Sequence, residues 1–173
     1  MIAPVTALHK VSDVFKGLLI GSPLLRKIIS WTIAIPIANR QGPKLLRALF
    51  DPDAVPSDFP IRGGGLLGLR PSTFYGASSD IVVFEEVLPS YVARYQSLKI
   101  PIAILYGRGD QILDYREHGE TMKGKLPKLE LDLMDGGHML LVTAPDRCVA
   151  LVRRVADKLG GAPASASTAV PEA

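Results

Sequence analysis

The sequence has almost no cysteine and no long uninterrupted apolar run. The single cysteine, Cys148, excludes an internal disulfide framework and is typical of a reducing compartment, so we expect a cytoplasmic protein. The most apolar stretch, residues 17–38, is interrupted by two prolines and by the charged pair Arg26 and Lys27. Because a membrane-spanning helix needs about 20 mostly apolar residues, this stretch predicts helices that pack on the protein.

A strong excess of one charge is also missing. The chain of 173 residues has 20 Lys and Arg against 17 Asp and Glu, a net charge of +3, and no basic run of the kind that binds nucleic acid. The first ten residues lack the basic start, the long apolar region and the small-residue cleavage site of a signal peptide. With 47% hydrophobic residues, the chain can bury the core of one domain.

Motifs for metals and phosphates are absent as well. His9 and His118 are isolated in the sequence, without the Cys, His or acid spacing of a metal site, and we expect both at the surface or in a cap. The glycine-rich run RGGGLLG, residues 62–68, lacks the Lys-Ser/Thr of a P-loop and follows no predicted strand. We therefore expect a turn there, and no cofactor and no metal in the protein.

Predicted strands and helices alternate in the second half of the chain, which is typical of a parallel sheet with helices on its faces. Apolar strands are predicted at residues 2–6, 100–107 and 129–136. Helices are predicted within 8–50 with Pro43 at a helix start, over 80–99 with a break near Pro89, over 115–126 and over 144–161. Residues 51–72 are predicted to be irregular.

An aspartate and a histidine follow the two later strands. Asp110 and His138 each come after glycines that permit a tight exit from the strand. Reactive groups in open α/β sheets lie on loops at the carboxyl ends of the strands, so adjacent strands would place both side chains on one rim. An ionised Asp110 would accept the Nδ1–H of His138 and leave Nε2 free to take a proton. Asp114 and Asp135 remain alternative partners for the histidine.

These two segments resemble the last two strands of an α/β-hydrolase. The matching motifs are Gly-x-x-Asp at 107–110, Gly-His at 137–138 and Pro-Asp at 145–146, and a looser likeness to esterase- and lipase-like members extends over residues 2–158. The resemblance implies an α/β protein, a partial α/β-hydrolase fold with parallel strands 6-7-8 and a helical cap region. It assigns the catalytic acid to Asp110 and the catalytic histidine to His138, in the chain order of the family.

The resemblance also divides the chain into four parts. Residues 1–6 are expected to be a strand remnant of the hydrolase core, 7–75 a helical cap or lid, 76–160 the carboxyl-terminal part of the core, and 161–173 a disordered tail.

The nucleophile of the family is not found. Members carry it on a Gly-x-Ser-x-Gly turn between a strand and a helix. The nearest match is GASSD, residues 76–80, where Ser78 lacks both the final glycine and a preceding strand, while Cys148 falls inside the last predicted helix. In the family the nucleophile and the oxyanion-hole loop precede the sixth strand. We therefore expect a fragment that holds the acid and the base, and an isolated chain without activity.

The implied partner is a small ester or other acyl substrate, bound once the missing half is supplied. Two alternatives stay open: a non-catalytic interaction module derived from a hydrolase half, and an epoxide hydrolase or dehalogenase with an Asp nucleophile in the missing part. The apolar cap and the open sheet edge are candidate contacts for a membrane surface or for a second copy of the chain.

Overall fold

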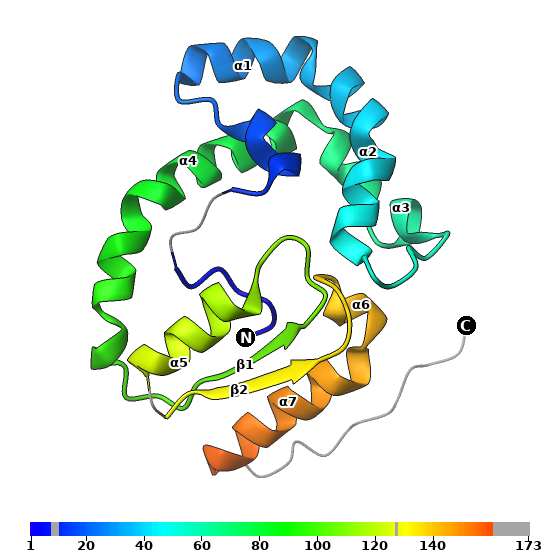
Figure 1. Cartoon of the computed structure of the whole chain (residues 1–173). Helices are drawn as coiled ribbons and strands as arrows, with labels where there is room; N and C mark the ends of the chain where they lie inside the picture. The colour runs from blue at the N-terminus through cyan, green and yellow to red at the C-terminus, as the bar shows by residue number, and fades with distance from the viewer. Residues whose placement is uncertain (8–10, 127, 161–173) are drawn as a thin grey trace.

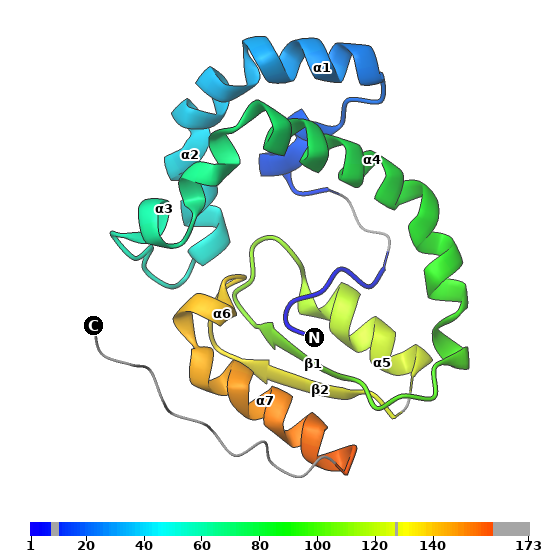
Figure 2. The ribbon, with the colours of Figure 1, turned by 180° about the vertical axis from the view of Figure 1, so that it is seen from behind.

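The computed structural model describes residues 1–7, 11–126 and 128–160. His9 and the predicted disordered tail 161–173 lie outside the described residues. Within the described ranges, no helix combines the length and the apolar character that crossing a bilayer demands. The molecule has a small parallel sheet at one end and a group of cap helices at the other, with the long helix α4 running between them (Figures 1 and 2).

Two parallel strands form the sheet. Strand β1 (Ala103–Gly107) pairs with β2 (Glu130–Met134) in a register that runs from Ala103 opposite Glu130 to Gly107 opposite Met134. On the other side of β1, Ile2 forms a single parallel bridge with Leu105. The order Ile2 segment, β1, β2 is the order expected for strands 6-7-8 of the partial hydrolase fold.

The first of these segments is much shorter than the strand predicted over residues 2–6. Two amide hydrogen bonds join it to β1: the N–H of Ala3 donates to the carbonyl of Leu105 at 2.8 Å, and the N–H of Leu105 donates to the carbonyl of Met1 at 3.1 Å. Ala3 then adopts a φ of +41°, and Pro4 has no N–H to donate. Both features end the ladder after one bridge.

Beyond Ala3, hydrogen bonds from side chains hold the segment in place of backbone pairing. The hydroxyl of Tyr106 donates to the carbonyl of Pro4, and the hydroxyl of Tyr95 donates to the carbonyl of Thr6 at 2.9 Å. Burial raises the pKa of both tyrosines. These bonds fix residues 4–6 against the sheet without making them a strand.

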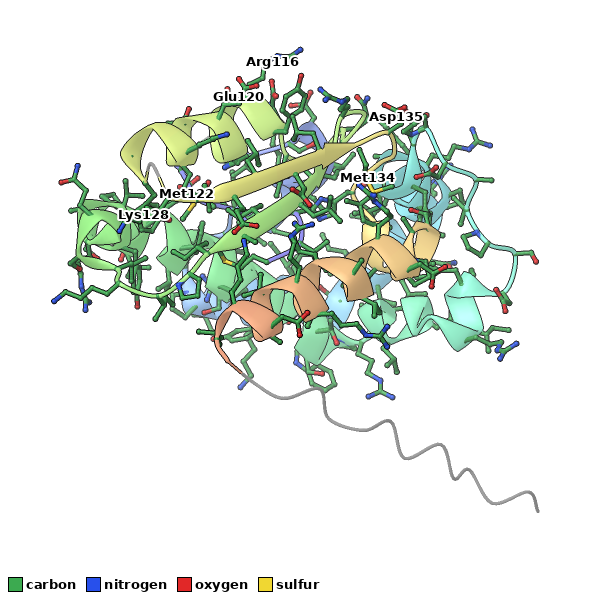
Figure 3. The ribbon with its side chains drawn as sticks, turned by 90° about the horizontal axis from the view of Figure 1, so that it is seen from below. Arg116, Glu120, Met122, Lys128, Met134 and Asp135 are labelled. Atoms are coloured by element: carbon green, nitrogen blue, oxygen red, sulfur yellow. The ribbon has the colours of Figure 1, made fainter. Side chains whose placement is uncertain are left out.

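Strand β1 is buried on both faces, as parallel strands usually are. Ile104 and Tyr106 face a core cluster that includes Met122 of helix α5 (Thr121–Lys125), which follows the π-helical turn Arg116–Glu120. Ala103 and Leu105 face a second cluster against helices α6 (Leu140–Thr143) and α7 (Pro145–Lys158). Helices α5 and α7 thus cover opposite faces of the sheet (Figures 1 and 3).

Strand β2 forms an edge protected by charge. Its residues Glu130 and Asp132 pair with Lys158 and Arg154 of α7, the Arg154–Asp132 contact being 2.5 Å. Charged side chains on an edge strand discourage pairing with another chain.

The cap is built from the elements that precede β1. They are η1 (Asp13–Leu18), α1 (Pro23–Thr32), α2 (Ala34–Phe50), α3 (Phe59–Arg62), η2 (Gly65–Leu69), α4 (Pro71–Ala93) and η3 (Tyr95–Ser97). The sequence analysis divides the chain between residues 75 and 76, and helix α4 runs across that boundary. The short elements α3 and η2 lie in the region predicted to be irregular.

Two predictions about prolines are wrong. Pro43 lies inside α2, which starts nine residues earlier, and Pro89 lies inside α4 without ending it. A proline inside a helix leaves the carbonyl four residues earlier without its partner. Here those carbonyls belong to Asn39 and Glu85, which are exposed like the prolines themselves, so water can satisfy them.

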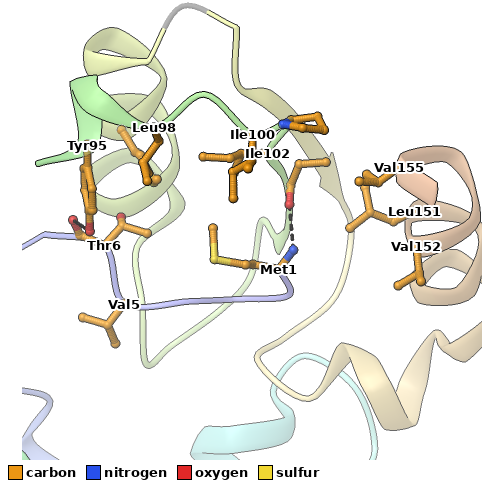
Figure 4. A pocket seen from close by; sticks show the side chains of 13 residues that line it. Met1, Val5, Thr6, Tyr95, Leu98, Ile100, Ile102, Leu151, Val152 and Val155 are labelled. Carbon is orange, nitrogen blue, oxygen red and sulfur yellow. Dashed lines mark hydrogen bonds between the residues drawn. The ribbon is translucent and has the colours of Figure 1, made fainter. Parts of the chain in front are cut away.

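An apolar cavity of about 420 Å³ lies on the Ile2 side of the sheet (Figure 4). Its walls come from the first residues of the chain, from the segment that enters β1 and from α7, and they include Met1, Tyr95, Leu98, Ile100, Leu151 and Val152. The amino group of Met1 donates to the carbonyl of Ala103 at 2.7 Å beside it. The two sides of the sheet therefore differ: the β2 side carries charged pairs, and the Ile2 side has an apolar cavity.

Candidate active site

Asp110 is held rigidly on the loop that leaves β1. Its Oδ1 accepts the backbone N–H groups of Ile112 at 2.8 Å and Leu113 at 2.9 Å. Only 1% of its side chain is exposed. A carboxylate that accepts two backbone donors in its own turn has one orientation, which leaves Oδ2 for another partner.

That partner is His138, on the loop that leaves β2. Its Nδ1 lies 2.8 Å from Oδ2 of Asp110, and 23% of the histidine side chain is exposed. The acceptor at Nδ1 favours the tautomer with hydrogen on Nδ1, in which Nε2 has the free lone pair. The structure thus brings together the two residues that the sequence predicts as a pair.

The two loops lie together because backbone hydrogen bonds continue past the ends of the strands. The N–H of Arg108 donates to the carbonyl of Met134 at 2.8 Å, and the N–H of Gly109 donates to the carbonyl of Gly136 at 3.0 Å. A Cβ on Gly107 would lie 2.3 Å from that same Gly136 oxygen. Gly136 itself has a φ of +138°, which side chains rarely permit. Glycine is required on both loops for the acid and the imidazole to meet.

A third carboxylate, which the sequence did not single out, ties the cap to the histidine loop. The N–H of Gly137 donates to Oδ2 of Asp53 at 3.1 Å. A Cβ on Gly137 would lie 2.4 Å from the carbonyl oxygen of Asp51, so the end of α2 packs directly on the loop. Phe50, fully buried, anchors that end by an edge-to-face contact with Phe59, with ring centroids 4.9 Å apart.

His138 lines a cavity of about 520 Å³ between the sheet and the cap. Its other walls come mainly from η1, from α4 and from the residues after Asp110; apolar members include Phe15, Ile81, Phe84, Leu88 and Leu113. Two carboxylates, Asp80 and Glu85, also lie at the wall. A mostly apolar cavity with a few ionisable side chains at its wall is a typical site for a small ligand.

The alternative acids do not contact the histidine. Asp114 accepts the N–H of Arg116 at 2.8 Å and also pairs with that guanidinium. Asp135 is exposed at the end of β2, as Figure 3 shows. Asp110 is therefore the carboxylate placed to orient His138.

Ser78 and Cys148 are both buried in helices. The hydroxyl of Ser78 donates to the carbonyl of Leu18 at 2.6 Å and accepts from Nε of Arg26 at 3.1 Å. The thiol of Cys148 donates to the carbonyl of Leu140 at 3.4 Å, and burial raises the pKa of this thiol. Both residues hold helices together.

The prediction that His118 lies at the surface is wrong, because the structure buries this residue fully. Its Nδ1 accepts the N–H of Thr6 at 3.3 Å, and its carbonyl accepts the hydroxyl of Thr6 at 2.6 Å. It joins the π-helical turn to the first residues of the chain. Across the described residues, no three His, Cys, Asp or Glu side chains gather as a metal site would require.

Comparisons with known proteins agree on the fold. No protein-family model and no curated protein sequence matches the chain. Among solved structures, the chain is similar to an α/β-hydrolase fold protein from Burkholderia ambifaria, with a TM-score of 0.61 at 14% identity over 87% of this chain and 54% of the other. It is also similar to a putative aryl esterase from Burkholderia cenocepacia, with a TM-score of 0.56 at 16% identity over 90% and 54%.

A membrane phospholipase A matches as well, with a TM-score of 0.55 at 21% identity over 93% of this chain and 49% of the other. The chain spans about half the length of each of these proteins. With its strand order, its cap and its loops at the carboxyl ends of the strands, the chain carries a partial α/β-hydrolase fold.

Proposed function

We propose that this chain is the acid-and-histidine part of a serine hydrolase that acts on carboxylic esters or related acyl compounds. The observation that carries the proposal is the 2.8 Å contact between His138 Nδ1 and Asp110 Oδ2 at the wall of the 520 Å³ cavity. Its support is the contrast in exposure: the carboxylate is buried and the imidazole is accessible. An orienting acid needs the first property, and a proton-transferring base needs the second.

The proposed chemistry assigns one step to each group. Nε2 of His138 takes the proton of a serine hydroxyl as the serine oxygen attacks the ester carbonyl, and the imidazolium then gives that proton to the leaving alcohol. Asp110 stabilises the imidazolium and keeps it in place. Water then hydrolyses the acyl-serine with the same histidine as base, which regenerates the serine.

The serine, in this proposal, comes from a polypeptide segment outside this chain that completes the sheet beside Ile2. The single bridge there and the apolar 420 Å³ cavity support this placement. Apolar area removed from water contributes ~25 cal/mol per Å², so every 100 Å² covered by that segment would add roughly 2.5 kcal/mol.

The isolated chain should therefore show negligible hydrolysis of p-nitrophenyl esters, because in this proposal the nucleophile and the oxyanion hole belong to the completing segment. The first experiment is to sequence the coding DNA upstream of Met1. An in-frame Gly-x-Ser-x-Gly within about a hundred codons supports the proposal, and its absence argues against it.

The second experiment co-expresses that upstream segment with this chain and assays p-nitrophenyl esters. Restored turnover should fall by about 10⁴ or more in His138→Ala and by about 10⁴ in Asp110→Asn. Asp114→Asn, which changes the neighbouring acid away from the histidine, is the matched control and should keep full activity. Turnover by the isolated chain that His138→Ala abolishes would contradict the assignment of the serine to another segment.

A second candidate is a non-catalytic interaction module, favoured by the apolar cavity on the open side of the sheet. It predicts a tight complex with an unrelated protein on co-purification, insensitive to His138→Ala. An Asp nucleophile in the completing segment would instead give turnover of epoxides or alkyl halides and none of esters.

A further inference from the structure

Helix α1 is inverted relative to an ordinary surface helix: its apolar face points outward. Leu24, Ile28 and Trp31, spaced at i, i+4 and i+7, form one stripe and are 69%, 53% and 69% exposed. The adjacent Leu25 is 50% exposed. We call these four residues the α1 stripe.

The inner face of α1 carries buried polar residues, and their contacts hold the helix in this orientation. Arg26 and Ser30 are the buried residues of the helix. The guanidinium of Arg26 donates to the carbonyl of Ile20 at 2.7 Å and to the hydroxyl of Ser78 at 3.1 Å, and it stacks over the ring of Tyr75. Rotating the helix to bury the α1 stripe would break these bonds and leave a buried cation without partners.

The segment around α1 is also strongly cationic. Residues 14–50 contain six Lys and Arg and no Asp or Glu, although the rest of the chain holds all 17 acidic residues. Lys27 is exposed on α1, and Arg40, Lys44 and Arg47 are exposed on α2. The charge of this region therefore suits an anionic surface.

We propose that the α1 stripe docks this protein on the surface of an anionic lipid bilayer. A ten-residue helix is about 15 Å long, too short to span the bilayer, so it lies in the interface with its stripe among the acyl chains. Trp favours this depth, and the surrounding cations face the anionic headgroups, each strengthening binding about fivefold where it reaches the surface. Figures 1 and 2 show α1 at the end of the molecule away from the sheet, where a planar surface can reach it.

A second copy of the chain fits this surface less well. Pairing two α1 stripes would bring together two segments that each expose four cations, Lys27, Arg40, Lys44 and Arg47, and contain no acidic residue between residues 14 and 50. The docking proposal is independent of the hydrolase proposal, because it uses none of the residues around His138.

Trp31 is the only tryptophan in the chain, so its fluorescence reports directly on the stripe. The full chain is titrated with vesicles of phosphatidylcholine alone and with vesicles that contain one third phosphatidylglycerol. On the anionic vesicles we expect a blue shift of the emission, protection from acrylamide quenching and at least tenfold stronger binding, weakened by 0.5 M NaCl.

Ile28→Glu and Lys27→Glu should each weaken this binding, Ile28→Glu by about tenfold or more. The matched control is Val149→Glu, which changes an exposed apolar residue on α7 and should bind as the wild type does. Circular dichroism checks that each variant is folded, and Leu24→Glu replaces Ile28→Glu if that variant is not.

Three results overturn the proposal: equal binding to neutral and anionic vesicles, equal loss of binding in Val149→Glu and Ile28→Glu, or no shift of the Trp31 emission. Sedimentation that shows a dimer lost on Ile28→Glu would assign the α1 stripe to self-association instead.

Discussion

Strand β1 is joined to its two neighbours in very different ways. Towards β2, five residue pairs are in register, and hydrogen bonds from Arg108 and Gly109 extend the contact into the loops. Towards Ile2, one bridge is formed, and the Met1 amino group and the Tyr106 hydroxyl add one hydrogen bond each. The acid and the histidine both lie on the β1–β2 side. Their geometry therefore depends on contacts within this chain and not on whatever covers the opposite side.

The largest effect is expected when the carboxylate that organises the β1–β2 side is removed. Asp110→Ala should lower the free energy of unfolding by about 2–5 kcal/mol, because it leaves the buried N–H groups of Ile112 and Leu113 without acceptors. Urea denaturation followed by circular dichroism measures it. Asp114→Ala, at a half-exposed carboxylate, is the control and should change stability by less than about 1 kcal/mol. Equal losses would mean that Asp110 is only a loop residue.

A smaller effect is expected from crowding the two loops. Gly107→Ala places a Cβ 2.3 Å from the oxygen of Gly136, and the backbone must shift at a cost of about 1–3 kcal/mol. The control is Gly124→Ala in α5, where nothing lies within 4 Å of the new Cβ and stability should stay equal or rise slightly. In Gly107→Ala the NMR signals of the His138 ring should also move. Unchanged signals would show that the loops adapt without disturbing the pair.

Hydrogen exchange compares the two sides of β1 within one experiment. The amide of Leu105 donates to Met1 on the open side, and the amide of Arg108 donates to Met134 on the β2 side. We expect Leu105 to exchange at least about tenfold faster relative to its intrinsic rate, because opening the single bridge requires little else to unfold. Comparable protection at the two amides would mean that the Ile2 segment is as stable as β2.

The smallest effect concerns the charged edge of β2. The hydrogen bond from Lys158 lowers the pKa of Glu130, with Arg154 adding to it. A lowered pKa stabilises the fold above the unfolded pKa of Glu130, and this contribution disappears as the pH falls through the folded value. Lys158→Ala should move the pKa of Glu130 back towards its ordinary value in an NMR titration while the unfolding midpoint at pH 7 stays unchanged within error. A large loss of stability would show that the edge depends on this pair.

Much of the sheet could be predicted from the sequence, because its signals are local. The apolar runs give β1 and β2, and the glycines with Asp110 and His138 predict one rim, which the 2.8 Å contact matches. The run IAPVT was over-predicted as a strand. Its apolar pattern is real, but the positive φ of Ala3 and the missing N–H of Pro4 end the pairing.

The cap was harder to predict, because the exposure of each residue depends on the tertiary structure and not on the local sequence. Pro43 and Pro89 are strong breaking signals, yet both lie on exposed faces where water can reach the carbonyl that loses its hydrogen bond. His118 is buried and bonded to Thr6, 112 residues away in the sequence. Nothing in the local sequence reveals such a partner.

The bond between Asp53 and the N–H of Gly137 has a mechanical consequence. It crosses from the cap to the residue next to His138, so any rearrangement of the end of α2 must either carry the imidazole with it or break that bond. By thermodynamic reciprocity, a ligand that tightens the hold of Asp110 on the ring would also restrain the cap. The roof of the cavity and the His138 ring would then respond to a ligand as one coupled unit.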